Sequence, residues 1–152
     1  MGQDWRLSKM DKGLRGTRRP VKTGAQTLAK EDSGALCLFN TAAGYTFTLP
    51  PAEQGLWFEF AVHTTITSSA AKVITASGDF LVGTFIQSTD GTYTSTNRDA
   101  DGSTHVSWNG NGSTTGGLIG DWFRVVAISD TQWFILGMGR ATGSEATPFA
   151  TS

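Results

Sequence analysis

Short stretches that alternate between apolar and polar residues, each ended by a turn sequence, fill most of this chain and limit what it can fold into. Residues 45–49 alternate at every position and are stopped by two prolines. Residues 122–129 and 132–138 are the clearest stretches, and the Asp-Thr pair between them is typical of a hairpin turn. Shorter stretches of the same kind are found at residues 35–39, 56–65, 73–76, 80–87, 92–96 and 105–108.

Short strands separated by turns at intervals of roughly 8–12 residues are typical of a β-sandwich or a jelly roll. The sequence therefore predicts an all-β fold, an antiparallel β-sandwich with a jelly-roll-like body. We expect antiparallel pairing because consecutive hairpins bring neighbouring strands together in opposite directions. The composition agrees with one folded domain, since only 16% of the 152 residues are charged while 11% are aromatic and 19 are glycine.

The charges are divided unevenly along the chain. Residues 1–30 contain eight basic and two acidic side chains, a net charge of +6, whereas residues 31–152 contain four basic and eleven acidic ones, a net charge of −7. The first thirty residues also lack strand alternation and are interrupted by glycines and a proline. We therefore expect three parts: an extended basic N-terminal arm (1–30), a β-sandwich body (31–138) and a C-terminal tail (139–152).

An imbalance of this kind is typical of an interaction tail, so we predict that the arm binds a partner. Its basic residues would act through charge, and its apolar residues, at near-helical spacing, would anchor it. The predicted contact residues are Trp5, Arg6, Leu7, Lys9, Met10, Lys12, Leu14, Arg15, Arg18, Arg19 and Lys22. An acidic protein surface suits this arm better than nucleic acid, because Trp5 is the one aromatic residue there that can stack on bases. A solvated tail is the remaining alternative.

The sequence contains no arrangement of residues typical of an active site. It has no G-x-S-x-G nucleophile motif and no G-K-[ST] phosphate loop. His63 and His105 are far apart in strand-like stretches, where a histidine is usually a half-buried strand residue. Cys37, the only cysteine, lies between two leucines and is expected in the core. We therefore expect no enzymatic activity, no cofactor and no metal.

One acidic stretch is similar to part of a calcium site. Residues 97–102 (Asn-Arg-Asp-Ala-Asp-Gly) match the first half of a calcium-binding loop, with oxygen ligands at alternate positions before a glycine. Trp108 stands where the loop should end in glutamate, and no flanking helices are predicted. We favour a surface turn over a calcium site at Asn97 to Asp101.

The tryptophans of the body have two interpretations, a platform for stacking sugars or packing in a core or between subunits. Trp122 and Trp133 open the two strands of one predicted hairpin, so we expect them to pack across it. Packing is therefore favoured over sugar binding for these residues and for Trp57 and Trp108.

Nothing in the sequence predicts a membrane protein. No stretch is apolar over the length that a membrane span requires, and residues 1–30 lack the apolar centre of a signal peptide. We expect a soluble protein made in a cytoplasm, with no membrane partner.

Several motifs of the body form a recognisable pattern. They are Y-T-F-T-L-P-P-A-E-Q-G-L-W-F-E-F at residues 45–60, V-I-T-A at 73–76, G-D-F-L-V-G at 78–83, G-D-W-F-R-V-V at 120–126 and Q-W-F-I-L-G at 132–137. With these motifs, residues 31–138 resemble the β-sandwich modules of tailed-bacteriophage virion proteins, which include capsid decoration (cement) proteins and modules of head or tail fibres. The motifs do not distinguish capsid from tail.

The resemblance implies a non-enzymatic viral structural protein. The short chain without internal repeats favours a decoration protein, which would bind the major capsid protein, stabilise the shell and lie on the capsid surface of the virion after assembly in the host cytoplasm. It also implies a homo-oligomer, with a trimer favoured. The alternative is a receptor- or glycan-binding module of a fibre, which would bind through the loops at 89–101 and 109–117. An enzyme such as a depolymerase is least favoured, because no catalytic pair of carboxylates can be chosen.

Overall fold

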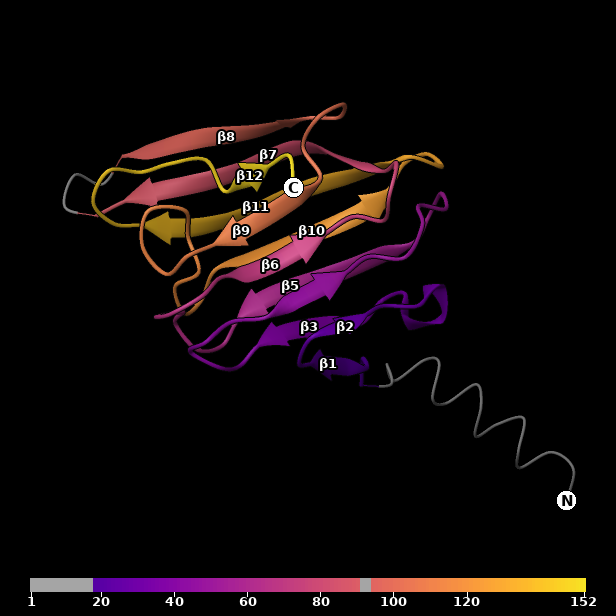
Figure 1. Cartoon of the computed structure of the whole chain (residues 1–152), viewed down its shortest axis with the longest axis horizontal. Helices are drawn as coiled ribbons and strands as arrows, with labels where there is room; N and C mark the ends of the chain where they lie inside the picture. The colour runs from indigo at the N-terminus through magenta and orange to yellow at the C-terminus, as the bar shows by residue number, and fades with distance from the viewer. Residues whose placement is uncertain (1–17, 91–93) are drawn as a thin grey trace, which may run out of the picture.

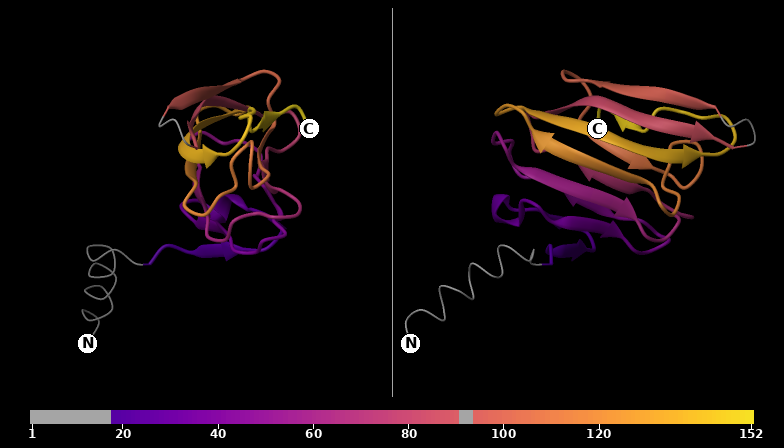
Figure 2. Two further views of the ribbon diagram at one scale, coloured as in Figure 1. Left: turned by 90° about the vertical axis from the view of Figure 1, so that its left-hand side faces the viewer. Right: turned by 180° about the vertical axis from the view of Figure 1, so that it is seen from behind.

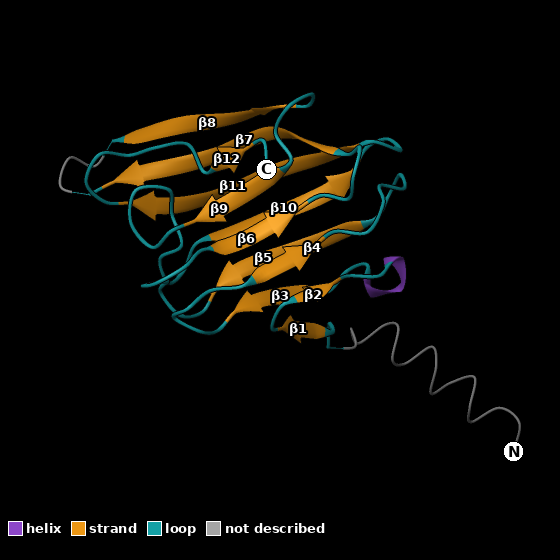
Figure 3. Cartoon of the chain, in the orientation of Figure 1, coloured by secondary structure: helices purple, strands orange, loops and turns teal. Residues whose placement is uncertain are grey.

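The computed structural model describes residues 18–90 and 94–152, and nearly all of their regular structure is β-strand. The all-β prediction is confirmed. The one helical element in this part of the chain is a 3-10 turn at Lys30–Asp32 (Figure 3). The strands are β1 (Val21–Thr23), β2 (Gln26–Thr27), β3 (Leu36–Phe39), β4 (Thr46–Thr48), β5 (Trp57–Val62), β6 (Ala71–Ile74), β7 (Phe80–Thr89), β8 (Ser95–Asp101), β9 (Ser107–Gly110), β10 (Trp122–Ala127), β11 (Gln132–Ala141) and β12 (Phe149–Ala150).

These strands form two sheets that lie one behind the other (Figure 1). The first sheet has seven strands in the order β1-β3-β5-β10-β11-β7-β8, and the second has five in the order β12-β9-β6-β4-β2. Figure 2 shows them edge-on at the left, and from behind at the right with the seven-stranded sheet nearer the viewer.

Both sheets are mixed, so the prediction of a purely antiparallel fold is wrong. The predicted hairpin of β10 and β11 is antiparallel, but β3–β5, β7–β11 and β4–β6 are parallel pairs. For β3–β5 and β4–β6 the physical reason is the path of the chain. From β3 to β7, successive strands fall in opposite sheets, so two neighbours in one sheet are joined through a strand of the other and run in the same direction.

The inner faces of the two sheets share one hydrophobic core. Phe47 of β4 has its ring centroid 5.3 Å from that of Phe39 in β3 and 5.7 Å from that of Phe60 in β5. Trp108 of β9 lies 4.6 Å from Phe123 of β10 between ring centroids. Burying an aromatic side chain of this size is worth about 1.5–3 kcal/mol, so these contacts between the sheets are a main source of stability.

The structure differs from the predicted arm over residues 18–30, because two short strands there join the body. β1 pairs with β3 in the seven-stranded sheet, and β2 pairs with β4 in the five-stranded sheet. Gly24, at φ 80°, lies between β1 and β2, and Leu28 after them is fully buried. The strands contain only three and two residues, too few for alternation to reveal them. Residues 1–17 of the predicted arm lie outside the described residues.

The predicted tail from residue 139 also takes part in the fold. β11 continues to Ala141, and β12 adds Phe149 opposite Trp108 at one edge of the five-stranded sheet. Phe149 is 4% exposed, so it belongs to the core. The strand predicted at 92–96 begins and ends later, as β8. Its partner β7 continues to Thr89, so the turn between the two strands also lies later in the chain than predicted.

Candidate functional site

The seven-stranded sheet has an outer face, formed by the side chains that point away from the five-stranded sheet. Along β11 the inward Trp133 and Ile135 are fully buried. The outward Phe134, Leu136 and Met138 have exposed fractions of 39%, 49% and 59%. Both faces of β11 are therefore apolar, so the strand can pack against another layer on each side. In the described chain, only its inner face is covered by such a layer.

The strand register extends these three residues into an apolar patch. Val126 of β10 and Val82 of β7 lie on either side of Phe134, and Trp122 and Ile86 lie on either side of Met138. We define the apolar patch by seven outward residues at the centre of the sheet, which are Val82, Ile86, Trp122, Val126, Phe134, Leu136 and Met138.

Two shallow hollows, both open to solvent, lie on this face. One, of about 350 Å³, is lined by Trp122, Arg124, Val126, Phe134 and Leu136. The other, of about 330 Å³, lies where β7 and β11 meet the loop before β10, and its lining includes Ile86, Ile119, Asp121, Met138 and Arg140. Ile119 is 55% exposed, so it extends the apolar surface beyond the patch.

A charged cluster borders the patch on the β5 side. Glu59 of β5 accepts hydrogen bonds from the guanidinium groups of Arg19 and Arg124, and its side chain is only 10% exposed. Both guanidinium carbons lie 4.9 Å from the ring centroid of Trp57. Burial alone would raise the pKa of Glu59, but the hydrogen bonds from the two arginines outweigh it and hold that pKa below its usual value.

Asp121 supports the second hollow from beneath. One carboxylate oxygen accepts the N–H groups of Gly117 and Leu118, and the other accepts that of Arg140 at 3.0 Å. Burial raises the pKa of Asp121 above its usual value, although these three hydrogen bonds act in the opposite direction. A Cβ atom at Gly139 would lie 2.7 Å from this carboxylate, so the position requires glycine. We assign Asp121 a structural role, because its oxygens are already occupied.

The predicted contact residues of the arm have different outcomes. Arg19 is held in the body by Glu59 and by the backbone oxygens of Gly34 and Ala35, and Lys22 pairs with Asp32 at 2.7 Å. These two cations are therefore used within the fold, whereas Arg18 is exposed. The other predicted contacts lie outside the described residues: Trp5, Arg6, Leu7, Lys9, Met10, Lys12, Leu14 and Arg15.

The four tryptophans of the body divide between the two sides of the sheets. Trp108 and Trp133 are fully buried, as predicted for packing in a core. Trp57 and Trp122 are half-buried on the outer face. The expected contact of Trp122 with Trp133 across the hairpin is wrong, since Trp122 pairs with Met138 and Trp133 with Ala127 at the other end. Strands of a hairpin run in opposite directions, so residues that open both strands lie at opposite ends.

The remaining candidates from the sequence show no site chemistry. Cys37 is fully buried as predicted, and burial raises the pKa of its thiol to about 12. His63 is exposed in a bend, not half-buried in a strand. Among the described residues, no three His, Cys, Asp or Glu side chains gather as metal ligands would.

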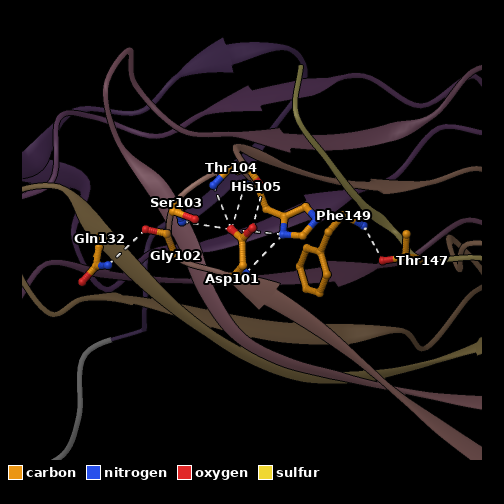
Figure 4. A network of polar contacts seen from close by, with 8 residues as sticks. All are labelled: Asp101, Gly102, Ser103, Thr104, His105, Gln132, Thr147 and Phe149. Carbon is orange, nitrogen blue, oxygen red and sulfur yellow. Dashed lines mark hydrogen bonds and ion pairs between the residues drawn. The ribbon is translucent and has the colours of Figure 1, made fainter.

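The stretch that resembles a calcium loop forms the end of β8 and the start of the turn after it, so the surface turn predicted at Asn97 to Asp101 is wrong. The carboxylate of Asp101 accepts hydrogen bonds from the N–H groups of Ser103 and Thr104, while the Asp101 N–H donates to Nδ1 of His105 at 3.1 Å (Figure 4). The hydroxyl of Thr104 and these N–H groups hold the pKa of Asp101 far below its usual value. Asp101 therefore closes the turn between β8 and β9, which joins the two sheets.

Sequence reasoning missed the outer face, although a signal for it was present. In Trp-Phe-Ile-Leu-Gly-Met at residues 133–138 the alternation fails, because the residues on both sides of the strand are apolar. In a fold of two layers, a strand needs apolar residues only on the side that faces the other layer. A second apolar side therefore indicates that the outer face has a contact of its own.

Comparison with family models, with curated proteins and with solved structures found no match to this chain. In the described ranges, no helix has the length and apolar character needed to cross a membrane. The candidate site is therefore defined by its geometry alone, and its chemistry is that of an apolar surface bordered by charges.

Proposed function

We propose that this protein is a non-enzymatic structural protein that binds other proteins through the outer face of its seven-stranded sheet. Its partner in this proposal is the major capsid protein of a tailed bacteriophage. The two sheets would form a jelly-roll-like sandwich on the capsid surface, where the protein acts as a decoration protein that stabilises the shell. We propose a homo-oligomer for this state, with a trimer favoured, because several copies that hold one site dissociate slowly.

The observation that carries the proposal is the apolar patch at the centre of the outer face. Leu136 and Met138 are about half exposed or more, although both lie on a central strand of the sheet. These residues adjoin other exposed apolar side chains in the patch, and contiguous exposed apolar surface often marks a site where proteins bind partners. Apolar contacts alone do not fix how a partner is oriented on the surface. Partly buried charges at the border of the patch, such as Glu59 with Arg124, would fix the orientation of the bound partner.

The sequence of residues 1–17 supports a second attachment point. It contains four basic and two acidic side chains, a net charge of +2, whereas residues 18–152 carry eight basic and eleven acidic ones, a net charge of −3. Attachment by charge would therefore depend on Arg6, Lys9, Lys12 and Arg15, with Arg18 beside them, rather than on Arg19 and Lys22.

The alternative of a glycan-binding fibre module has no specific support on the described surface. Trp108, the residue expected to stack on a sugar, has an exposed fraction of 0%. Trp57 already has two guanidinium groups at its ring.

Cosedimentation with DNA-free capsid shells of a phage that encodes this chain tests the proposal. The full-length protein should pellet with the shells and reach saturation. A variant with Lys12→Ala, Arg15→Ala and Arg18→Ala should pellet less, and the difference should diminish at high salt, where charge attraction is screened. A wild-type protein that stays in the supernatant at every shell concentration would overturn the capsid assignment.

A further inference from the structure

The apolar patch is too small to be a complete interface between two folded proteins. It spans the three strands β10, β11 and β7, about 10 Å across at about 4.8 Å per strand, and three outward positions along each strand, about 13 Å. A stable contact between folded proteins buries about 800 Å² on each side, several times the footprint of the patch. A short segment of chain fits these dimensions by itself, whereas a folded partner would need further contacts around the patch.

The chain itself enters the fold at one edge of the sheet that carries this patch. Arg19 directly precedes the edge strand β1, and its side chain reaches over Trp57 to donate to Glu59, so the described chain begins at the β1 edge on the β5 side of the patch. The nearest strand of the patch, β10, is three strands away from β1, about 14 Å. Leu14 precedes Arg19 by five residues, and five residues can span about 17 Å. The preceding segment is therefore long enough to reach the patch.

The sequence of residues 1–17 matches the patch in chemistry. Leu7, Met10 and Leu14 are spaced at i, i+3 and i+7, which is typical of a helix with one apolar stripe. The charges match as well. Asp99 and Asp101 of β8 point outward and are exposed, on the side of the patch opposite to Arg19. The basic side chains of the segment would therefore meet acidic ones after crossing the patch.

We propose that residues 1–17 of the same chain lie across the outer face and cover the apolar patch. Attachment of this segment through Arg19 makes the contact intramolecular, so its effective concentration is high and even a weak contact is populated. The C-terminal end gives a precedent on the opposite sheet, where the backbone oxygen of Ser152 accepts hydrogen bonds from the outward Lys72 and Ser107. This inference concerns the isolated protein, and binding of the proposed capsid partner to the patch would displace the segment, so the inference does not depend on the capsid assignment.

Thiol labelling in the full-length chain tests the proposal. Met138→Cys places a reactive thiol in the patch, whereas Cys37 is fully buried and its thiol stays protonated. Two proteins are compared, one with Met138→Cys alone and one that also carries Leu7→Ser, Met10→Ser and Leu14→Ser. We expect a maleimide to react with the introduced cysteine about tenfold more slowly in the first protein than in the second. Leu136→Cys provides a second site with the same expectation if Met138→Cys disturbs the fold.

The control and the protein concentration decide the interpretation. Ile74→Cys, on the outer face of the five-stranded sheet, should react at the same rate with either segment sequence. Equal rates at residues 136 and 138 in both backgrounds would overturn the proposal. Protection that increases with protein concentration would also overturn it, because the cover would then be the segment of a second copy.

Discussion

The two sheets of this protein have outer faces of opposite character, although the same alternation builds both. On the seven-stranded sheet the outward central residues form the apolar patch. On the five-stranded sheet the outward positions of β4, β6 and β9 are mostly polar, and part of them is covered by the C-terminal residues. These positions are Thr46, Thr48, Lys72, Ile74, Ser107 and Asn109. An outer face needs no apolar residues for the fold, so those of the seven-stranded sheet indicate a contact beyond it.

The largest expected effect separates inward from outward aromatic residues. Trp108→Ala should lower the free energy of unfolding by about 3–5 kcal/mol, because it leaves a cavity between the sheets. Trp122→Ala, on the outer face, should lower it by about 1 kcal/mol. Urea unfolding at pH 7 measures both. Similar losses would mean that the outer face is as much part of the core as the inner one.

The next effect concerns the charged border of the patch. Glu59→Gln should lower the free energy of unfolding by about 1–2 kcal/mol at pH 7, because hydrogen bonds from two arginines become weaker, and the partial exposure of these arginines limits the loss. The pKa of Glu59 is lowered in the folded protein. Its contribution is therefore present above the unfolded pKa of 4.5 and is lost as the pH falls through the folded pKa.

Urea unfolding of the wild type and of Glu59→Gln between pH 7 and pH 2 checks this sign. The gap between the two proteins should be constant from pH 7 to about pH 5 and should close at lower pH. A gap that widens in acid would show that Glu59 does not act through its charge.

A smaller effect is expected when the apolar patch itself is altered. Leu136→Thr with Met138→Thr keeps residues that favour strands, so each should change the free energy of unfolding by at most about 0.5 kcal/mol. Ile74→Thr on the other outer face is the matched control and should behave alike. A loss of several kcal/mol for the patch variant alone would show that these residues hold the fold together rather than bind a partner.

The smallest effect should be local to the turn that joins the sheets. Asp101→Ala removes the acceptor of the Ser103 and Thr104 N–H groups, so hydrogen exchange at these two amides should become faster. Exchange at β10 and β11 should stay unchanged. Faster exchange throughout β10 and β11 would mean that this turn controls the stability of the whole sheet.

The sequence was sufficient to predict the fold class and most strands, because single-sided alternation and turn residues are local signals. The hairpin of β10 and β11 shows this, since both strands begin where the sequence places them. The parallel pairs could not be predicted in this way. Pairing of β7 with β11 depends on a strand that lies more than forty residues later in the chain, and no local pattern specifies it.

The candidate site was less accessible to sequence reasoning. The arm prediction used the total charge of residues 1–30, but Arg19 and Lys22 are bound to Glu59 and Asp32, which lie up to forty residues away. A count of charges cannot distinguish cations that the fold neutralises from those that remain available. The apolar patch was missed because its residues come from three strands and become neighbours only through the register of the sheet.

One binding measurement compares the two outer faces of the protein directly. Full-length Leu136→Thr/Met138→Thr and full-length Ile74→Thr are each cosedimented with the same DNA-free capsid shells, beside the wild type. The patch variant should lose most of its binding, whereas Ile74→Thr should pellet like the wild type. If the patch variant pellets as well as the wild type, the outer face of the seven-stranded sheet is not the surface that binds the shell.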